Sequence, residues 1–156
     1  MNRRAQFTGG THELSKAEIG DEFEPFEITI TEEMVERSTW ANDDYNPWYL
    51  EDSPFGGRIA SPMFLSLHLQ NIFWNHYTFP SGGALHTSQE FDFINPLKIG
   101  KKIKIIGKLV DKYHRRGRDT YVSEYLAVDE DGTEIVRMKR TEATPVVRFH
   151  PGKKKS

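Results

Sequence analysis

Residues 62–74 constrain the fold of this chain more than any other segment. The segment begins with Pro62 directly after Ser61, and a serine followed by a proline is typical of a capped helix start. A helix that is apolar on every side is buried, either in a protein core or in a membrane. This one is too short and too polar to cross a bilayer, so we expect it to lie in the protein core. Apolar side chains surround the predicted helix almost completely, at Met63, Phe64, Leu65, Leu67, Leu69, Ile72, Phe73 and Trp74.

The rest of the chain supplies a sheet that would bury this helix. Polar and apolar residues alternate in residues 24–30, and four more strand candidates follow the helix, at 84–94, 102–112, 119–128 and 133–148. Asp131-Gly132, between the last two, is a strong hairpin signal. Thr31, followed by two glutamates, is predicted to cap a short helix that ends near Ala41. The predicted fold class is α+β, with a curved antiparallel sheet wrapped around one buried helix.

Three parts of the chain are expected to differ in order. Residues 1–18 are polar and contain Gly, Ser and Thr, so we expect a flexible arm; residues 19–149 form one domain, and residues 150–156 form a disordered basic tail. Residues 42–61 are dense in Asn, Asp, Pro and Gly and are predicted to be a long loop. Long ordered loops of this kind are often functional.

Composition excludes several classes of protein. A chain of 156 residues suits one domain. Its net charge of -2 means that it has no excess of positive charge to attract nucleic acid. The absence of cysteine excludes disulfides, thiolate catalysis and Cys-based zinc sites, and the six histidines form no zinc pattern, so we expect no metal. The N-terminal segment has no apolar run typical of a secretory signal, and we therefore expect a soluble, cytoplasmic protein that does not bind membranes.

Two motifs resemble a known family. The segment Asp44-Tyr45-Asn46-Pro47-Trp48-Tyr49, followed by residues 57–63, resembles the hydratase motif of MaoC-like proteins. Residues 85–91 and the turn Pro96-Leu97-x-x-Gly100 are similar to the strand and turn that follow the central helix of the hot-dog fold. The resemblance covers residues 20–149 and is closest to the dehydratase domains of fungal-type fatty acid synthases.

This resemblance implies an activity and its partners. MaoC-like proteins hydrate trans-2-enoyl thioesters or catalyse the reverse dehydration, with an aspartate and a histidine that activate a water. They need no metal or organic cofactor beyond the CoA or phosphopantetheine arm of the acyl-CoA or acyl-carrier-protein substrate. Because the edges of such a sheet pair across a two-fold axis, we expect a homodimer or higher oligomer. A heterodimer with another MaoC-like chain is the alternative.

Hydration needs a base for water, a proton for the α-carbon and donors for the enolate oxygen. Asp44 is the candidate base, since a carboxylate in an apolar tunnel gains basicity through desolvation. Asn46 would orient it or the water, and the alternative for both residues is a purely structural role in the turn around Pro47. Tyr49 occupies the position of the family histidine; a phenol is a poor base at neutral pH but donates a hydrogen bond.

The remaining candidates lie around the helix start. The glycine that donates the oxyanion N–H in the family aligns with Pro62, which has no N–H, so the N–H groups of Met63 and Phe64 are expected to replace it. His86 is a candidate base, or else a strand histidine bonded to backbone or solvent. Trp48 and Phe64 would line the acyl pocket, or else belong to the core.

Three functions fit this pattern. We rank first an active hydratase or dehydratase with an atypical site. The second is a catalytically silent subunit of a heteromeric dehydratase, and the third is an acyl-CoA thioesterase or acyl-CoA binder.

Overall fold

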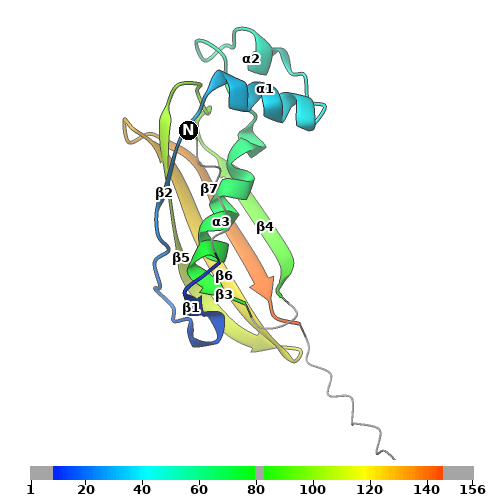
Figure 1. The fold of residues 1–156 in the computed structure, drawn as a ribbon, viewed down its shortest axis with the longest axis vertical. Coiled ribbons are helices and arrows are strands. Elements are labelled where there is room, and N and C mark those ends of the chain that lie inside the picture. The colour runs from blue at the N-terminus through cyan, green and yellow to red at the C-terminus, as the bar shows by residue number, and fades with distance from the viewer. Residues whose placement is uncertain (1–8, 80–82, 146–156) are drawn as a thin grey trace, which may run out of the picture.

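The structure is a computed structural model that describes residues 9–79 and 83–145. It contains a five-stranded antiparallel sheet in the order β2-β5-β6-β7-β4 (Figure 1). The strands are β2 (Phe26–Thr29), β4 (Leu85–Phe93), β5 (Lys102–Arg115), β6 (Arg118–Asp129) and β7 (Glu134–Ala143). All of them fall within or close to the segments predicted from alternating polarity, and the α+β arrangement is confirmed. In β5, for example, Ile103 and Ile105 are fully buried against the helix, whereas Lys102 and Lys104 face solvent.

The central helix α3 (Ser66–His76) lies across the inner face of the sheet, after a short 3-10 helix, η2 (Pro62–Leu65) (Figure 1). Leu69, Ile72 and Phe73 are buried against the strands. The helix approaches β5 closely at Gly107, where a Cβ atom would lie 2.9 Å from Ile72 Cδ1. This contact explains why the strand carries a glycine there.

Two predictions about this helix are wrong in part. Ser61 stands at the N-cap position of η2, but its side chain makes no capping hydrogen bond. The helix is also not buried on every side, because Leu67 and Met63 remain 63% and 49% exposed. The sheet covers only one side of the helix and leaves the flank that carries Leu67 open.

Residues 9–18 pack onto the domain and differ from the flexible arm expected for residues 1–18. Within them β1 (His12–Glu13) pairs in parallel with β3 (Tyr77–Thr78), and η1 (Leu14–Lys16) follows. Leu14 and Ala17 are only 1% and 5% exposed, so two apolar side chains and a short backbone ladder hold a segment of polar sequence. Residues 1–8 and the predicted tail at 150–156 lie outside the described residues.

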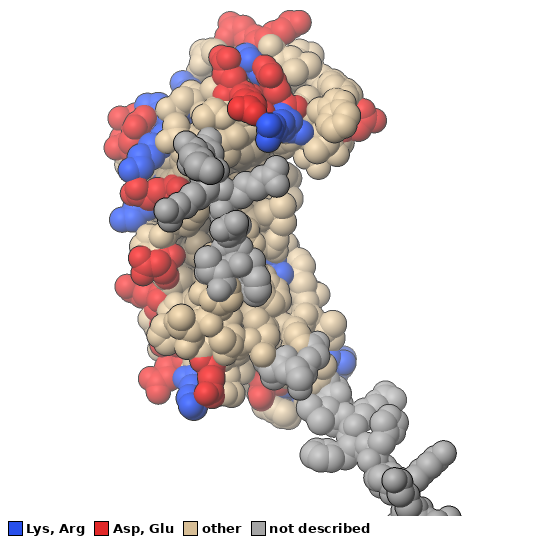
Figure 2. All heavy atoms as spheres, in the orientation of Figure 1, with Lys and Arg blue, Asp and Glu red and all other residues tan. Residues whose placement is uncertain are grey.

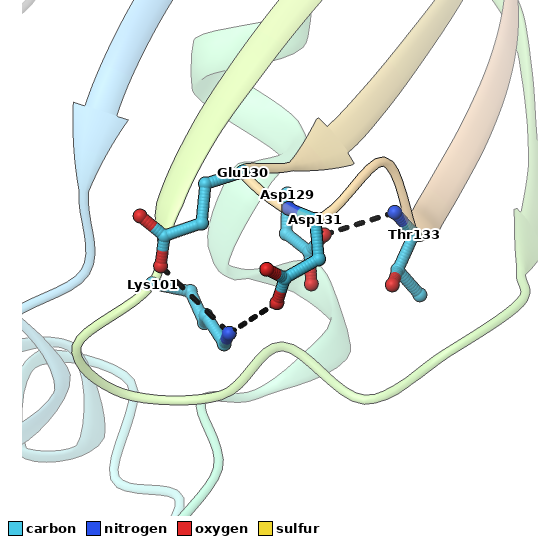
Figure 3. A network of polar contacts seen from close by, with 5 residues as sticks. All are labelled: Lys101, Asp129, Glu130, Asp131 and Thr133. Carbon is cyan, nitrogen blue, oxygen red and sulfur yellow. Dashed lines mark hydrogen bonds and ion pairs between the residues drawn. The ribbon is translucent and has the colours of Figure 1, made fainter.

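The predicted hairpin connects β6 and β7, and its turn is held by the polar network of Figure 3. Asp129 accepts hydrogen bonds at Oδ1 from the N–H groups of Asp131 and Thr133, both at 2.9 Å. Lys101 reaches over from the start of β5, with its Nζ 2.5 Å from Asp131 and 3.8 Å from Glu130. The turn chemistry read from the sequence is therefore confirmed, and the Lys101 contacts add a link to the neighbouring strand.

Candidate active site

Helices α1 (Glu32–Ala41) and α2 (Pro47–Leu50), with the loops around them, cover the end of the molecule at which α3 begins (Figure 1). We call residues 32–60 the cap. Thr31 caps α1 as predicted, by accepting a hydrogen bond from Met34 N–H at 3.3 Å. Figure 2 shows acidic and basic side chains interspersed over the cap and along the β2 side, without a large patch of one sign on that face.

One arginine ties the cap together. Arg58 donates from Nε to the carbonyl oxygen of Tyr49 at 3.0 Å, and its guanidinium lies 3.5 Å from the Glu36 carboxylate. These contacts join α1, α2 and the loop before α3, and they hold the backbone of Tyr49 in place. Sequence analysis missed this role, since the three residues are far apart in sequence and no motif joins them.

A cavity of about 420 Å³ lies between the cap and the start of α3. It brings together four candidates from the sequence, namely Asp44, Tyr49, Met63 and Phe64. Tyr49 is only 7% exposed, whereas Asp44 stays exposed at the mouth, so the prediction of a desolvated Asp44 inside an apolar tunnel is wrong for this single chain. The full lining consists of Val35, Ser38, Thr39, Asn42, Asp44, Tyr49, Ser61, Met63, Phe64, Ser66 and Leu67.

The end of α1 turns Asp44 toward this cavity. Asp43 adopts a left-handed backbone conformation, with φ of 52°, which ends the helix. The N–H of Asp44 then donates to the carbonyl oxygen of Thr39 at 3.0 Å. An aspartate tolerates the left-handed region better than most residues, which explains the aspartate at position 43.

The start of α3 leaves one backbone donor free at the cavity. Pro62 is exposed and has no N–H, as the sequence indicated. The N–H of Phe64 donates to the carbonyl oxygen of Ser61 at 2.9 Å and is therefore occupied. Met63 N–H has no acceptor in the described part of the chain, and first-turn N–H groups have no partner within their own helix. Of the three predicted oxyanion positions, only Met63 offers a free N–H.

Three other predicted site residues do not line the cavity. Asn46 caps α2, with its Oδ1 accepting from Trp48 N–H at 3.0 Å, and the ring of Trp48 packs edge-on against Phe55. His86 pairs with Glu142 near the end of β7 and lies 3.1 Å from the Ser88 carbonyl oxygen. It thus lies at the opposite end of β4 from the loop that carries Leu97, whose carbonyl oxygen accepts from Ala60 N–H beside the cavity. Within one chain, the structure separates His86 from Asp44.

His68 is the histidine of α3 closest in sequence to the cavity residues. Its ring stacks on Phe26 with centroids 5.7 Å apart and contacts Phe64 at 6.0 Å. Burial lowers the pKa of His68 below its ordinary value of 6.5, so the ring is neutral at pH 7. It supports the wall that Phe64 forms and does not itself line the cavity.

Sequence analysis missed much of the cavity wall. Ser38, Thr39 and Asn42 of the α1 side line it, as do Ser61 and Ser66 from the start of α3. The only sequence signal is the spacing of 38 and 42, which share a helix face. Small polar residues on a helix normally indicate a solvated surface, so this signal alone identifies no site.

A second hollow, of about 730 Å³, lies across the sheet. Five of its charged residues alternate in sign from strand to strand at one register, in the order Glu22, Lys108, Glu124, Lys139, Glu90. Glu90 and Phe91 of the 85–91 motif line it, but no candidate catalytic residue does, and cross-strand pairs of this kind are ordinary features of an exposed sheet face. In the described residues, no group of three or more His, Cys, Asp or Glu side chains is arranged to hold a metal ion. No helix of the described chain is long and apolar enough to cross a membrane.

Comparison with known families identifies the domain. The model of the FAS1-like, dehydratase domain region family matches residues 17–138. The chain belongs to this family. No curated protein matches the FAS1-like dehydratase chain significantly in sequence.

Solved structures of MaoC-like proteins share the fold of this FAS1-like dehydratase chain. The MaoC-like dehydratase from Rhodospirillum rubrum has a TM-score of 0.71 and 14% identity, covering 88% of this chain and 99% of its own. The R-hydratase PhaJ1 from Pseudomonas aeruginosa has a TM-score of 0.69 and 18% identity, covering 91% and 94%. A chain of the HadBC 3R-hydroxyacyl-ACP dehydratase complex from Mycobacterium tuberculosis has a TM-score of 0.70 and 19% identity, covering 83% and 99%. The predicted hot-dog fold and the MaoC-like resemblance are confirmed.

Proposed function

We propose that the chain is a hydro-lyase that hydrates a trans-2-enoyl thioester, or dehydrates the corresponding 3-hydroxyacyl thioester. One observation carries the proposal: Asp44, Tyr49 and the free N–H of Met63 meet at one cavity at the start of α3. A carboxylate can serve as the base and as the proton source for the α-carbon, and an unpaired backbone donor can bind the enolate oxygen, which are the requirements of this reaction.

In the hydration direction Asp44 takes a proton from a water molecule at the cavity mouth. The water oxygen bonds to C3 of the enoyl group, and the electrons of the C2–C3 double bond move to the thioester oxygen. Met63 N–H donates a hydrogen bond to that enolate oxygen. The enolate then collapses, and C2 takes the proton back from the Asp44 carboxyl group. Tyr49 donates a hydrogen bond to the water, a task that does not require a base.

The proposal also covers the carrier of the acyl group and the oligomeric state of the chain. The acyl group arrives on CoA or on the phosphopantetheine of a carrier protein, and no other cofactor takes part.

The uncovered flank of α3, with Leu67 63% exposed, and the open edge of β4 fit a second copy of the chain. Antiparallel pairing of two β4 strands would bring the His86 end of one strand to the Phe93 end of the other. His86 therefore stays a candidate catalytic residue only within such a dimer.

Asp44→Asn tests the proposed reaction. With trans-2-enoyl-CoA substrates, followed by loss of the enoyl-thioester absorbance, we expect kcat/KM to fall at least about a hundredfold, the low end for a general base. Tyr49→Phe removes one hydrogen bond and should cost about tenfold. Asp43→Asn is the matched control, because an asparagine accepts the same left-handed conformation outside the cavity lining.

Full turnover by the Asp44→Asn variant would rule out this mechanism. Free thiol released from acyl-CoA would indicate the thioesterase alternative instead. The altered positions Tyr49 and Pro62 favour a silent subunit as the second candidate function. That alternative predicts a chain inactive alone that gains hydration activity when co-expressed with a second MaoC-like chain, whereas a homodimer active by itself excludes it.

A further inference from the structure

The wall of the cavity that faces the start of α3 is polar. Ser38, Thr39 and Asn42 form most of it, all from α1 or its C-cap, beside the apolar Val35 of the same helix. A pocket for an unsubstituted alkyl chain would present apolar side chains on all sides, since acyl binding depends on burial of apolar surface. Here the opposite wall carries the apolar side chains of Met63, Phe64 and Leu67 together with the hydroxyls of Ser61 and Ser66.

The polar wall has hydrogen-bonding capacity that the protein does not use. Thr39 is only 5% exposed and lines the cavity, and its hydroxyl makes no hydrogen bond within residues 9–79 and 83–145. Asn42 donates from Nδ2 to the carbonyl oxygen and the hydroxyl of Ser38, at 2.8 and 3.2 Å. Its Oδ1 remains available as an acceptor at the cavity. Buried polar groups are normally satisfied, so an unused hydroxyl beside a cavity points to a ligand group that pairs with it.

The charges of the lining restrict what that ligand group is. Asp44 is the one charged residue among the cavity-lining residues described above. Both arginines of the cap are occupied: Arg58 by Glu36 and by the Tyr49 carbonyl oxygen, and Arg37 by Glu33. A carboxylate on the acyl group would thus meet another negative charge and no free cation, which disfavours it. A neutral donor suits both the Asn42 acceptor and the Thr39 hydroxyl.

We propose that the preferred substrate is a short acyl thioester that carries a hydroxyl group on its acyl chain, and that Thr39 and Asn42 recognise this hydroxyl. This inference rests on the proposed hydratase function and names its substrate class. The cavity volume of about 420 Å³ agrees with a short chain, since it is near the small end of the range of roughly 300–1,000 Å³ usual for ligand pockets. A substrate of this class would come from a preceding reaction that hydroxylates or reduces a carbon of the chain beyond C3.

The test compares matched substrates. The 4-, 5- and 6-hydroxy derivatives of trans-2-hexenoyl-CoA are each assayed against the analogue in which a methyl group replaces the hydroxyl. We expect at least one hydroxylated substrate to exceed its methyl analogue about tenfold in kcat/KM, the value of one hydrogen bond. A thioester that ends in a carboxylate should be the poorest substrate of the series.

Two variants connect this preference to the polar wall. Thr39→Val removes the hydroxyl and keeps the side chain nearly the same shape. Asn42→Ala removes the acceptor at an exposed position, where the substitution should not prevent folding. Each should lower the ratio of hydroxylated to methyl substrate about tenfold. Thr141→Val, on β7 and outside the cavity lining, is the matched control and should leave the ratio unchanged.

The outcomes separate this inference from the function itself. Hydration of the alkyl substrates with no preference for any hydroxylated one overturns the inference and leaves the hydratase function standing. A preference that survives both Thr39→Val and Asn42→Ala also overturns it, because recognition then lies elsewhere. If no thioester of either series is hydrated, both the proposed function and the inference fail.

Discussion

A buried ion pair lies on the sheet, and its removal should show how much a buried charge costs in free energy of unfolding. Arg140 and Glu142 lie on β7, are 5% and 3% exposed, and approach to 2.6 Å between Nε and Oε1. Gln70 of α3 accepts a hydrogen bond from Arg140. Burial raises the pKa of Glu142 above its ordinary value, although the nearby guanidinium opposes this shift. Each charge of the pair is therefore stabilised in this region of low dielectric by the opposite charge of its partner.

The expected magnitudes follow from this burial. Glu142→Leu or Arg140→Met alone leaves an uncompensated buried charge, and we expect each to lower the free energy of unfolding by about 3–5 kcal/mol. That is at least about a fifth of the roughly 5–15 kcal/mol by which a domain is usually stable. The double variant removes both charges and keeps apolar volume, so it should cost less than either single change.

Urea unfolding followed by circular dichroism measures these free energies. All variants are compared at one protomer concentration, because assembly would otherwise change the apparent stability. The exposed pair Lys139–Glu124, 3.8 Å apart on the same sheet, is the control and should couple by less than about 1 kcal/mol. If the double variant loses the sum of the two single losses, the two charges are not coupled and the reasoning is refuted.

Two further predictions concern the packing of α3. Gly107→Ala would place a Cβ atom 2.6 Å from Tyr125 Cδ1 and 2.9 Å from Ile72 Cδ1, so urea unfolding should show a loss of about 1–3 kcal/mol from overpacking. At the C-terminal end of the helix, burial and the neighbouring His12 lower the pKa of His76 from its ordinary 6.5. The unfolded chain then binds a proton more readily than the folded one, so stability should fall as the pH drops below about 6.5. His76→Gln should flatten this part of a plot of Tm against pH, and an unchanged slope would contradict the assignment.

The sequence by itself determined the five strands of the main sheet and the two longer helices, but not β1, β3, η1 or α2. Alternating polarity identified the strands, Thr31 with its two glutamates identified the start of α1, and Asp131-Gly132 identified the last hairpin. These features are local, because period and turn chemistry act between residues close in sequence. The motif around Asp44 and Tyr49 likewise indicated the segment that carries the site.

Only the tertiary structure decided which side chains share the cavity. Thr39 and Asn42 reach it because α1 packs over the start of α3, whereas His86 lies at the far end of its strand. The burial of Leu14 could not be predicted from the sequence either, because it depends on a parallel ladder with residues more than sixty positions away. Distances between such residues are set by how whole elements pack, and no local pattern encodes that packing.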